Sequence, residues 1–97
     1  MTKNVSVNTL RLKYKSKFVD IKLTYTEGGL AHMEVSAPVT PLEKTSFKKI
    51  ATTVSKLVYS GVHSRSSILG KMERLVGVDY DVLSFMKKVV RDHLKLD

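Results

Sequence analysis

The stretch FVDIKLTYTEGGLAHMEVSA, residues 18–37, determines the fold class. Apolar and polar residues alternate strictly from Val19 to Tyr25, which is typical of a strand with one buried face. Gly28 and Gly29 predict a turn, since glycine adopts positive φ without a steric penalty. Alternation then resumes, which predicts an antiparallel hairpin whose second strand turns three residues inward: Ala31, Met33 and Val35.

Another strand is expected before this hairpin. In TLRLKYKSKF, leucine and tyrosine alternate with arginine and lysine, which predicts an apolar inner face and a basic outer face. Val5 and Val7 are out of phase with Leu10, so residues 1–8 form an additional short strand, a bulge or an arm. We therefore expect a three-stranded antiparallel sheet within residues 9–36, with a fourth short N-terminal strand as an open alternative.

Helical periodicity replaces the alternation after Pro38. Thr40, Pro41 and Glu43 form a strong helix start, with threonine as N-cap, proline in the first turn and glutamate completing a capping box. Gly61 is placed to end this helix. The apolar stripes predict helices at residues 40–60, 64–76 and 79–96.

Strands followed by helices indicate an α+β fold. Ninety-seven residues fit one domain, so residues 1–97 are expected to form one sheet covered on one face by three helices. The buried stripes of the second and third helices are expected to include Val76 and His93 respectively.

Composition limits the setting and the chemistry. The chain has no cysteine, so disulfides and cysteine-ligated metals are excluded. No apolar run approaches the ~20 residues of a membrane span, and the N-terminus lacks the apolar block of a secretory signal. These features favour a cytoplasmic location without membrane contact.

Net charge is the main functional signal. The chain has 17 Lys and Arg residues against 9 Asp and Glu, a net charge of +8 and an isoelectric point near 9.8. Such an excess favours nucleic acid or an acidic protein as partner. An equally open interpretation is a solvated strand face that resists aggregation. The predicted nucleic-acid-binding residues are Arg11, Lys13, Lys15, Lys17 and Lys22.

The tyrosines divide into two pairs. Tyr14 and Tyr25 fall on the apolar side of predicted strands and are expected in the core. Tyr59 and Tyr80 fall near helix ends, where they are placed to stack on bases. The sheet would keep one open face, and such a face often pairs with a symmetry mate, so we also expect a homodimer.

Residues 61–67 have two interpretations. In the first, they form a bend between helices, with Ser64 as an N-cap. In the second, the same helix start holds an anion or nucleotide, because free N–H groups and partial positive charge favour a phosphate. The residues of this alternative site are His63, Ser64, Arg65, Ser66 and Ser67.

Signatures of catalysis are sparse. The three histidines are far apart in the sequence, and none has a partner at metal-ligand spacing. No serine lies in a nucleophile-elbow context. We therefore expect a protein that is not an enzyme, with no catalytic residue, no metal site and no cofactor.

One resemblance emerges from GGLAHMEVSA and FKKIATTVSKLVYSGVHSRSSILGKMERLVGV. Together these segments resemble the TSCPD domain, which occurs at the C-terminus of cobalamin-dependent ribonucleotide reductases and in small stand-alone phage proteins. The matching features, within residues 9–78, are the Gly28-Gly29 turn, Leu57, Ser60-Gly61-Val62, Ile68 and Leu75-Val76-Gly77. The Thr-Ser-Cys-Pro-Asp motif itself is absent, so the resemblance implies a fold and a nucleotide-related or phage setting, but no metal or redox role.

Three functional hypotheses follow. The leading hypothesis is a small non-enzymatic protein that binds a polyanion, with nucleic acid as the expected partner. It is expected in the cytoplasm, which is the host's cytoplasm if the protein is phage-encoded. The second is a regulatory or anti-defence protein that binds an acidic protein or a nucleotide. The third is a structural module linked to ribonucleotide reduction, as the TSCPD resemblance implies.

Overall fold

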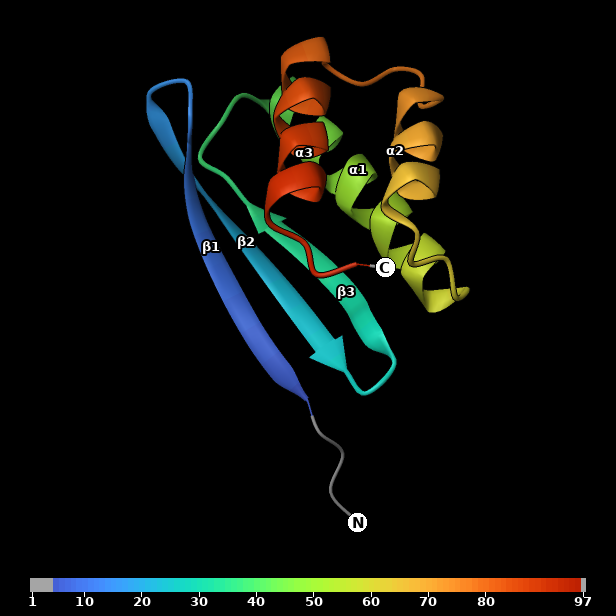
Figure 1. Cartoon of the computed structure of the whole chain (residues 1–97). Helices are drawn as coiled ribbons and strands as arrows, with labels where there is room; N and C mark the ends of the chain where they lie inside the picture. The colour runs from blue at the N-terminus through green and yellow to red at the C-terminus, as the bar shows by residue number, and fades with distance from the viewer. Residues whose placement is uncertain (1–4, 97) are drawn as a thin grey trace.

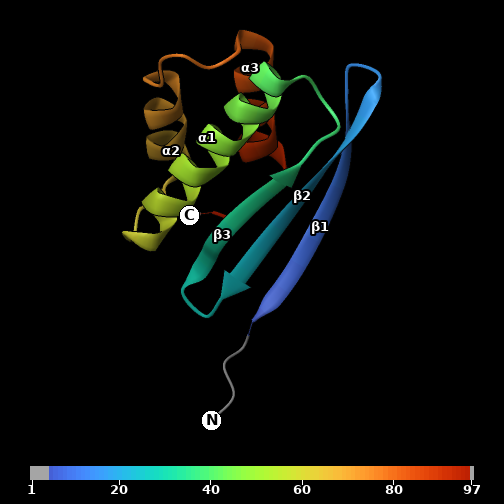
Figure 2. The same cartoon turned by 180° about the vertical axis from the view of Figure 1, so that it is seen from behind.

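The computed structural model describes residues 5–96, which form three strands followed by three helices (Figure 1). The sheet is antiparallel with the order β1-β2-β3, so β2 is central and β1 and β3 are edge strands. The helices cover one face of the sheet (Figures 1 and 2), so the α+β prediction is confirmed. The elements are β1 (Ser6–Tyr14), β2 (Lys17–Thr26), β3 (Gly29–Ser36), α1 (Pro41–Tyr59), α2 (Arg65–Glu73) and α3 (Tyr80–Asp92).

The core lies between the covered face of the sheet and the helices. Alternate residues of β2 point into it, which is why the period-two pattern of residues 18–26 predicted this strand correctly. Tyr14, Phe47 and Phe85 join β1, α1 and α3 through edge-to-face ring contacts with centroids 5.2–5.9 Å apart. Tyr14 and Tyr25 are both buried, as predicted.

A bulge alters the inward face of β3. Thr24 pairs with His32 but Tyr25 pairs with Leu30, which leaves Ala31 as the extra residue. Leu30 therefore takes the buried position that the alternation assigned to Ala31, and Ala31 is only half-buried. Met33 is buried as predicted.

The sheet begins earlier than predicted. β1 is continuous from Ser6, and Val7 pairs with Thr24 of β2. Val5 and Val7 are out of phase with Leu10 because they face the open side of the sheet, where both are half-exposed. No fourth strand occurs within residues 5–96, and residues 1–4 of the predicted arm lie outside the described part of the chain.

Local capping fixes both ends of α1. Thr40 accepts a hydrogen bond from the Glu43 N–H, and the Glu43 carboxylate accepts one from the Thr40 N–H, so the predicted capping box is present. At the other end, Gly61 has φ +92°, and the N–H groups of Gly61 and Val62 donate to Val58 and Leu57. This is a Schellman motif, and it turns the chain toward α2.

The second helix ends three residues earlier than predicted. Arg74 and Leu75 donate to carbonyls three residues back, which tightens the last turn and ends the regular helix. The predicted burial of Val76 is wrong, because Val76 lies in the following turn and is 78% exposed.

The third helix ends four residues earlier than predicted. The Arg65 guanidinium donates to the Val90 and Arg91 carbonyls, and the Lys95 N–H donates to the Tyr25 hydroxyl. These contacts replace the hydrogen bonds that would continue α3. His93 is therefore an exposed C-cap, and its predicted place in the buried stripe is wrong.

None of the helices within residues 5–96 is both long enough and apolar enough to span a bilayer.

Candidate anion-binding surfaces

The open face of the sheet carries three of the five predicted binding residues. Arg11, Lys13 and Lys22 lie at alternating positions on this face, which we call the sheet face. The acids on the same face offset them, since Asp20 lies 3.7 Å from Arg11 and Glu34 is the cross-strand neighbour of Lys22. The sheet face therefore holds three cations and two acids, and its charge excess is small.

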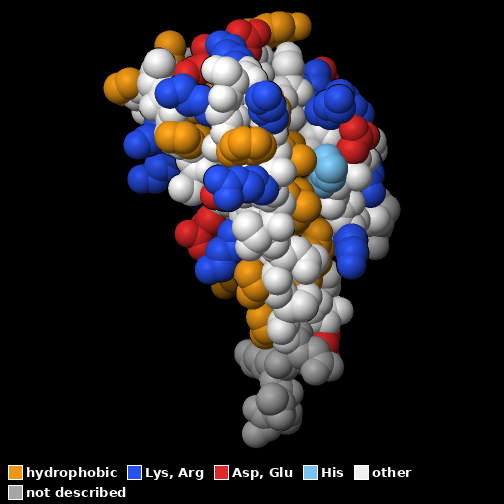
Figure 3. All heavy atoms as spheres, turned by 90° about the vertical axis from the view of Figure 1, so that its left-hand side faces the viewer, with side chains coloured by type: hydrophobic (Ala, Val, Ile, Leu, Met, Phe, Trp, Pro, Cys, Tyr) orange, Lys and Arg blue, Asp and Glu red, His pale blue; other side chains and the backbone are white. Residues whose placement is uncertain are grey.

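The surface around β1 has the same mixed character. Figure 3 views the molecule from the left-hand side of Figure 1, and its Lys and Arg side chains are separated by acidic and hydrophobic ones. Phe18 is half-exposed on the sheet face, and the Arg11 guanidinium lies 5.1 Å from the centroid of its ring. Arg11 is thus engaged by both a carboxylate and an aromatic ring.

Lys15 does not share the sheet face, so that part of the prediction is wrong. It sits in the β1–β2 turn with φ +56°, and its ammonium lies 3.2 Å from Glu43 and 3.3 Å from Asp81. Hydrogen bonds to these two carboxylates raise the pKa of Lys15. Lys17 pairs with Tyr14 at the start of β2. It is five residues from Lys22, so the two side chains point to opposite faces of the strand and Lys17 too is separate from the sheet face.

Glu43 is the centre of the contacts that hold Lys15. Its carboxylate accepts hydrogen bonds from the Thr40 hydroxyl, the Tyr14 hydroxyl at 2.9 Å and the Lys15 ammonium. These donors lower the pKa of Glu43 to about 2. Burial and the hydrogen bond to Glu43 raise the pKa of Tyr14 to about 12. The cluster ties the β1–β2 turn to α1.

Residues 61–67 form a capped bend. Ser64 is the N-cap of α2 and accepts a hydrogen bond from the Ser67 N–H, as predicted, and its hydroxyl lies 3.2 Å from that of Ser66. Arg65 points to the C-terminus of α3, where it donates to two carbonyls. His63 lies 3.1 Å from the Leu30 carbonyl. The two groups best suited to an anion, Arg65 and His63, are therefore engaged within the fold.

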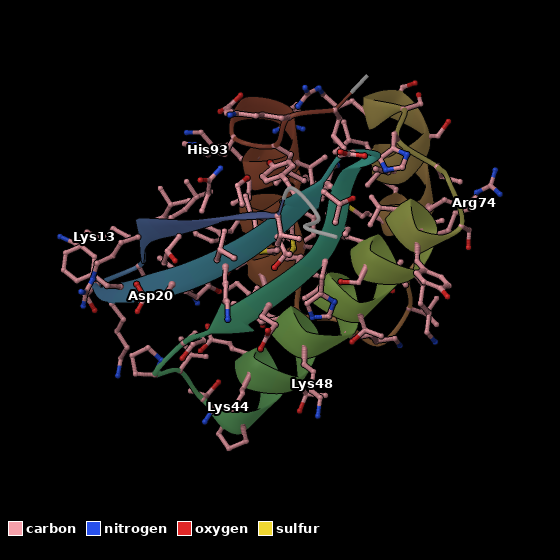
Figure 4. The ribbon with its side chains drawn as sticks, turned by 90° about the horizontal axis from the view of Figure 1, so that it is seen from below. Lys13, Asp20, Lys44, Lys48, Arg74 and His93 are labelled. Atoms are coloured by element: carbon pink, nitrogen blue, oxygen red, sulfur yellow. The ribbon has the colours of Figure 1, made fainter. Side chains whose placement is uncertain are left out.

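A different basic surface runs along α1. Lys44, Lys48 and Lys56 line one side of a groove between α1 and β3, with a volume of about 690 Å³. Figure 4 shows Lys44 and Lys48 extending outward from the first half of α1. Within residues 5–96, none of the three forms an ion pair. We call these three residues the lysine row.

The floor of the groove is formed by small and largely apolar side chains. Ser55 of α1 joins it to the edge of β3, since its hydroxyl accepts from the Met33 N–H at 3.0 Å and donates to the Met33 carbonyl at 3.2 Å. α1 and β3 lie side by side in Figures 1 and 2. The other floor residues include Ala31, Val35, Ala37 and Ala51.

The remaining walls are formed by the side chains of two residues with rings, His32 and Tyr59, and of one acidic residue, Glu34. His32 and Glu34 stand on the β3 side, 3.8 Å apart. Tyr59 lies at the end of α1 and is 90% exposed. The groove thus has cations along its helix side and a carboxylate on its strand side.

The apolar stripe of residues 40–60 leaves Lys44, Lys48 and Lys56 on the solvent side of the helix, but these lysines were not predicted as a site. Their spacing was visible, since Lys44, Lys48 and Lys56 are separated by multiples of four residues. The contribution of β3 was not visible, because it depends on which edge of the sheet lies beside α1.

Within the described part of the chain, no three side chains among His, Asp and Glu cluster closely enough to hold a metal ion. Comparison with protein-family models, curated proteins and solved structures found no match. The resemblance to the TSCPD domain therefore stays a prediction, and the function has to be argued from the surfaces alone.

Proposed function

We propose that this chain is a non-enzymatic nucleic-acid-binding protein and that the lysine row is its main contact with phosphates. The observation that carries the proposal is that Lys44, Lys48 and Lys56 line one side of the groove together and that, within residues 5–96, none of them forms an ion pair. A cation already paired with a carboxylate gains less from a phosphate, because the existing pair must be given up. Unpaired lysines on one helix side carry no such cost.

The overall charge supports the same partner class. A net charge of +8 attracts polyanions at long range and speeds their encounter with the protein. The lysine row then provides the local contacts. The sheet face, with Arg11, Lys13 and Lys22, has a secondary role in this proposal, since two acids lie among its cations.

The test is a fluorescence-anisotropy titration with short DNA and RNA oligonucleotides, single- and double-stranded. With three phosphate contacts, the affinity should fall ~20-fold for a single strand between ~50 and ~200 mM salt. The variant K44Q/K48Q/K56Q should bind weakly and lose most of this salt dependence.

The matched control is K71Q/K88Q/K95Q, which removes the same charge from exposed positions outside the groove. It should retain most of the affinity. The absence of binding to any oligonucleotide at either salt would overturn the proposal. Equal losses in both triple variants would show that net charge alone, and not the lysine row, is responsible.

A further inference from the structure

We infer that the groove between β3 and α1 is a site for single-stranded nucleic acid, held with its phosphates along α1 and its bases toward β3. This inference rests on the proposed function and specifies the form and the path of the ligand. It follows from the difference in charge between the two walls of the groove, from the apolar residues on its floor and from the exposed Tyr59 ring at one end.

The donors of α1 follow a regular spacing. Lys44, Lys48 and Lys56 are joined by Thr52 at the intervening position, and all four line the groove. Successive members are four residues apart, which is a rise of about 6 Å along the helix. This is close to one phosphate step of an extended polynucleotide, so one strand can meet the donors in turn.

The opposite wall disfavours a second phosphate backbone. Glu34 lies where the β3 side of the groove meets the sheet face, and its carboxylate would repel any phosphate placed on that side. A duplex presents two backbones, whereas a single strand presents phosphates on one side and bases on the other. The charge asymmetry therefore selects a single strand and sets its orientation.

The floor and the end of the groove suit bases. Ala31, Val35 and Ala51 offer an apolar surface. Tyr59 projects at the end of the lysine row with nearly all of its side chain exposed, so its ring is free to stack on a base. Stacking on aromatic rings beside a cationic track is the usual way in which proteins hold single strands.

The first experiment compares a single strand of thymidines with a duplex of the same length, at ~50 mM salt. We expect the single strand to bind at least ~10-fold more tightly. The variant E34Q should raise the affinity for the duplex more than the affinity for the single strand. Binding of nucleic acid with equal affinity for both forms would overturn this inference while leaving the proposed function intact.

The second experiment tests the path of the strand. Y59A should weaken single-strand binding ~10-fold, and Y59F should restore it, since stacking needs only the ring. The matched control is Y80A, which removes a similarly exposed tyrosine at the start of α3. Equal effects of Y59A and Y80A would contradict the path through the groove.

A third measurement separates nucleic acid from an acidic protein. Poly-glutamate should compete poorly with the single strand, because it offers charge without bases. Competition at equal charge concentration would overturn the inference and indicate a site for an acidic peptide.

Discussion

The sheet face and the lysine row hold three cations each, yet they differ in how those cations are paired. On the sheet face, Asp20 lies 3.7 Å from Arg11, whereas Glu34, which also lines the groove, lies across from Lys22 without forming an ion pair with it. In the lysine row, no described residue is ion-paired with Lys44, Lys48 or Lys56. The count of lysines in a segment is therefore a poor guide to its attraction for an anion, and the neighbours of each lysine decide.

Charge reversal should give the largest effect and separate the two surfaces. We expect K44E/K48E/K56E to lower nucleic-acid affinity by ~100-fold or more, because three contacts become three repulsions. The corresponding variant of the sheet face, R11E/K13E/K22E, should lose less than ~10-fold. Anisotropy titrations measure both, and circular dichroism confirms that each variant is folded. A larger loss in the sheet-face variant would reverse the comparison.

Removal of the Ser55 hydroxyl should weaken the fold beneath the lysine row. S55A leaves the Met33 N–H and carbonyl without their partner, at an expected cost of about 2 kcal/mol. For a chain of this size, the melting temperature should fall by about 10 °C. T52A, a neighbouring exposed position on α1, should change stability by less than ~0.5 kcal/mol. Thermal unfolding followed by circular dichroism distinguishes the two.

Neutralising one acid should make the affinity of the sheet face for nucleic acid more like that of the lysine row. D20N frees Arg11 from its ion pair, and we expect a gain in affinity of about two- to fivefold, in line with the small energies of exposed pairs. D92N makes the same charge change on α3 and serves as the control. No difference between D20N and D92N would mean that the sheet face does not contact the ligand.

The smallest effect on binding is expected at Glu43. E43Q releases Lys15 from one carboxylate, but this turn is separate from the groove, so affinity should change less than ~2-fold. Stability should respond to pH instead. The pKa of Glu43 is about 2 in the folded protein, below its ordinary value near 4.5, so its stabilisation is present above ~pH 4.5 and is lost as the pH falls toward 2.

Acid unfolding followed by circular dichroism checks this expectation. E43Q should be less stable than the wild type at pH 7 and should show a flatter pH dependence between ~pH 5 and pH 2. Y14F removes one of the donors to Glu43, and the stability of this variant should lie between those of the wild type and E43Q. An unchanged acid transition in E43Q would show that other carboxylates control it.

Much of the fold could be predicted from local signals in the sequence. The alternation from Val19 to Tyr25 and the capping box at Thr40 depend on neighbours within a few residues, and the structure contains both. The bulge at Ala31 and the early end of α3 could not be predicted, because they depend on pairing with β2 and on Arg65.

The basic surfaces were harder to predict than the fold. Lys15 looked like one of a row of strand lysines, but its partners Glu43 and Asp81 lie far away in the sequence. The row of lysines on α1 had a visible spacing, whereas the groove beside it required the position of β3. Ion pairs form between residues that are distant in the sequence, so their effect on a surface cannot be predicted from any one segment.

The hydroxyl of Ser55 also has a consequence for assembly. By occupying the outward backbone groups of Met33, it fills the place that a neighbouring strand would take at that edge. β1 is the other edge strand, so the Ser55 contact does not block another copy that joins there by main-chain pairing. Two copies joined through β1 would each use up that edge, and a continuous sheet would stop at six strands and not extend into a fibre.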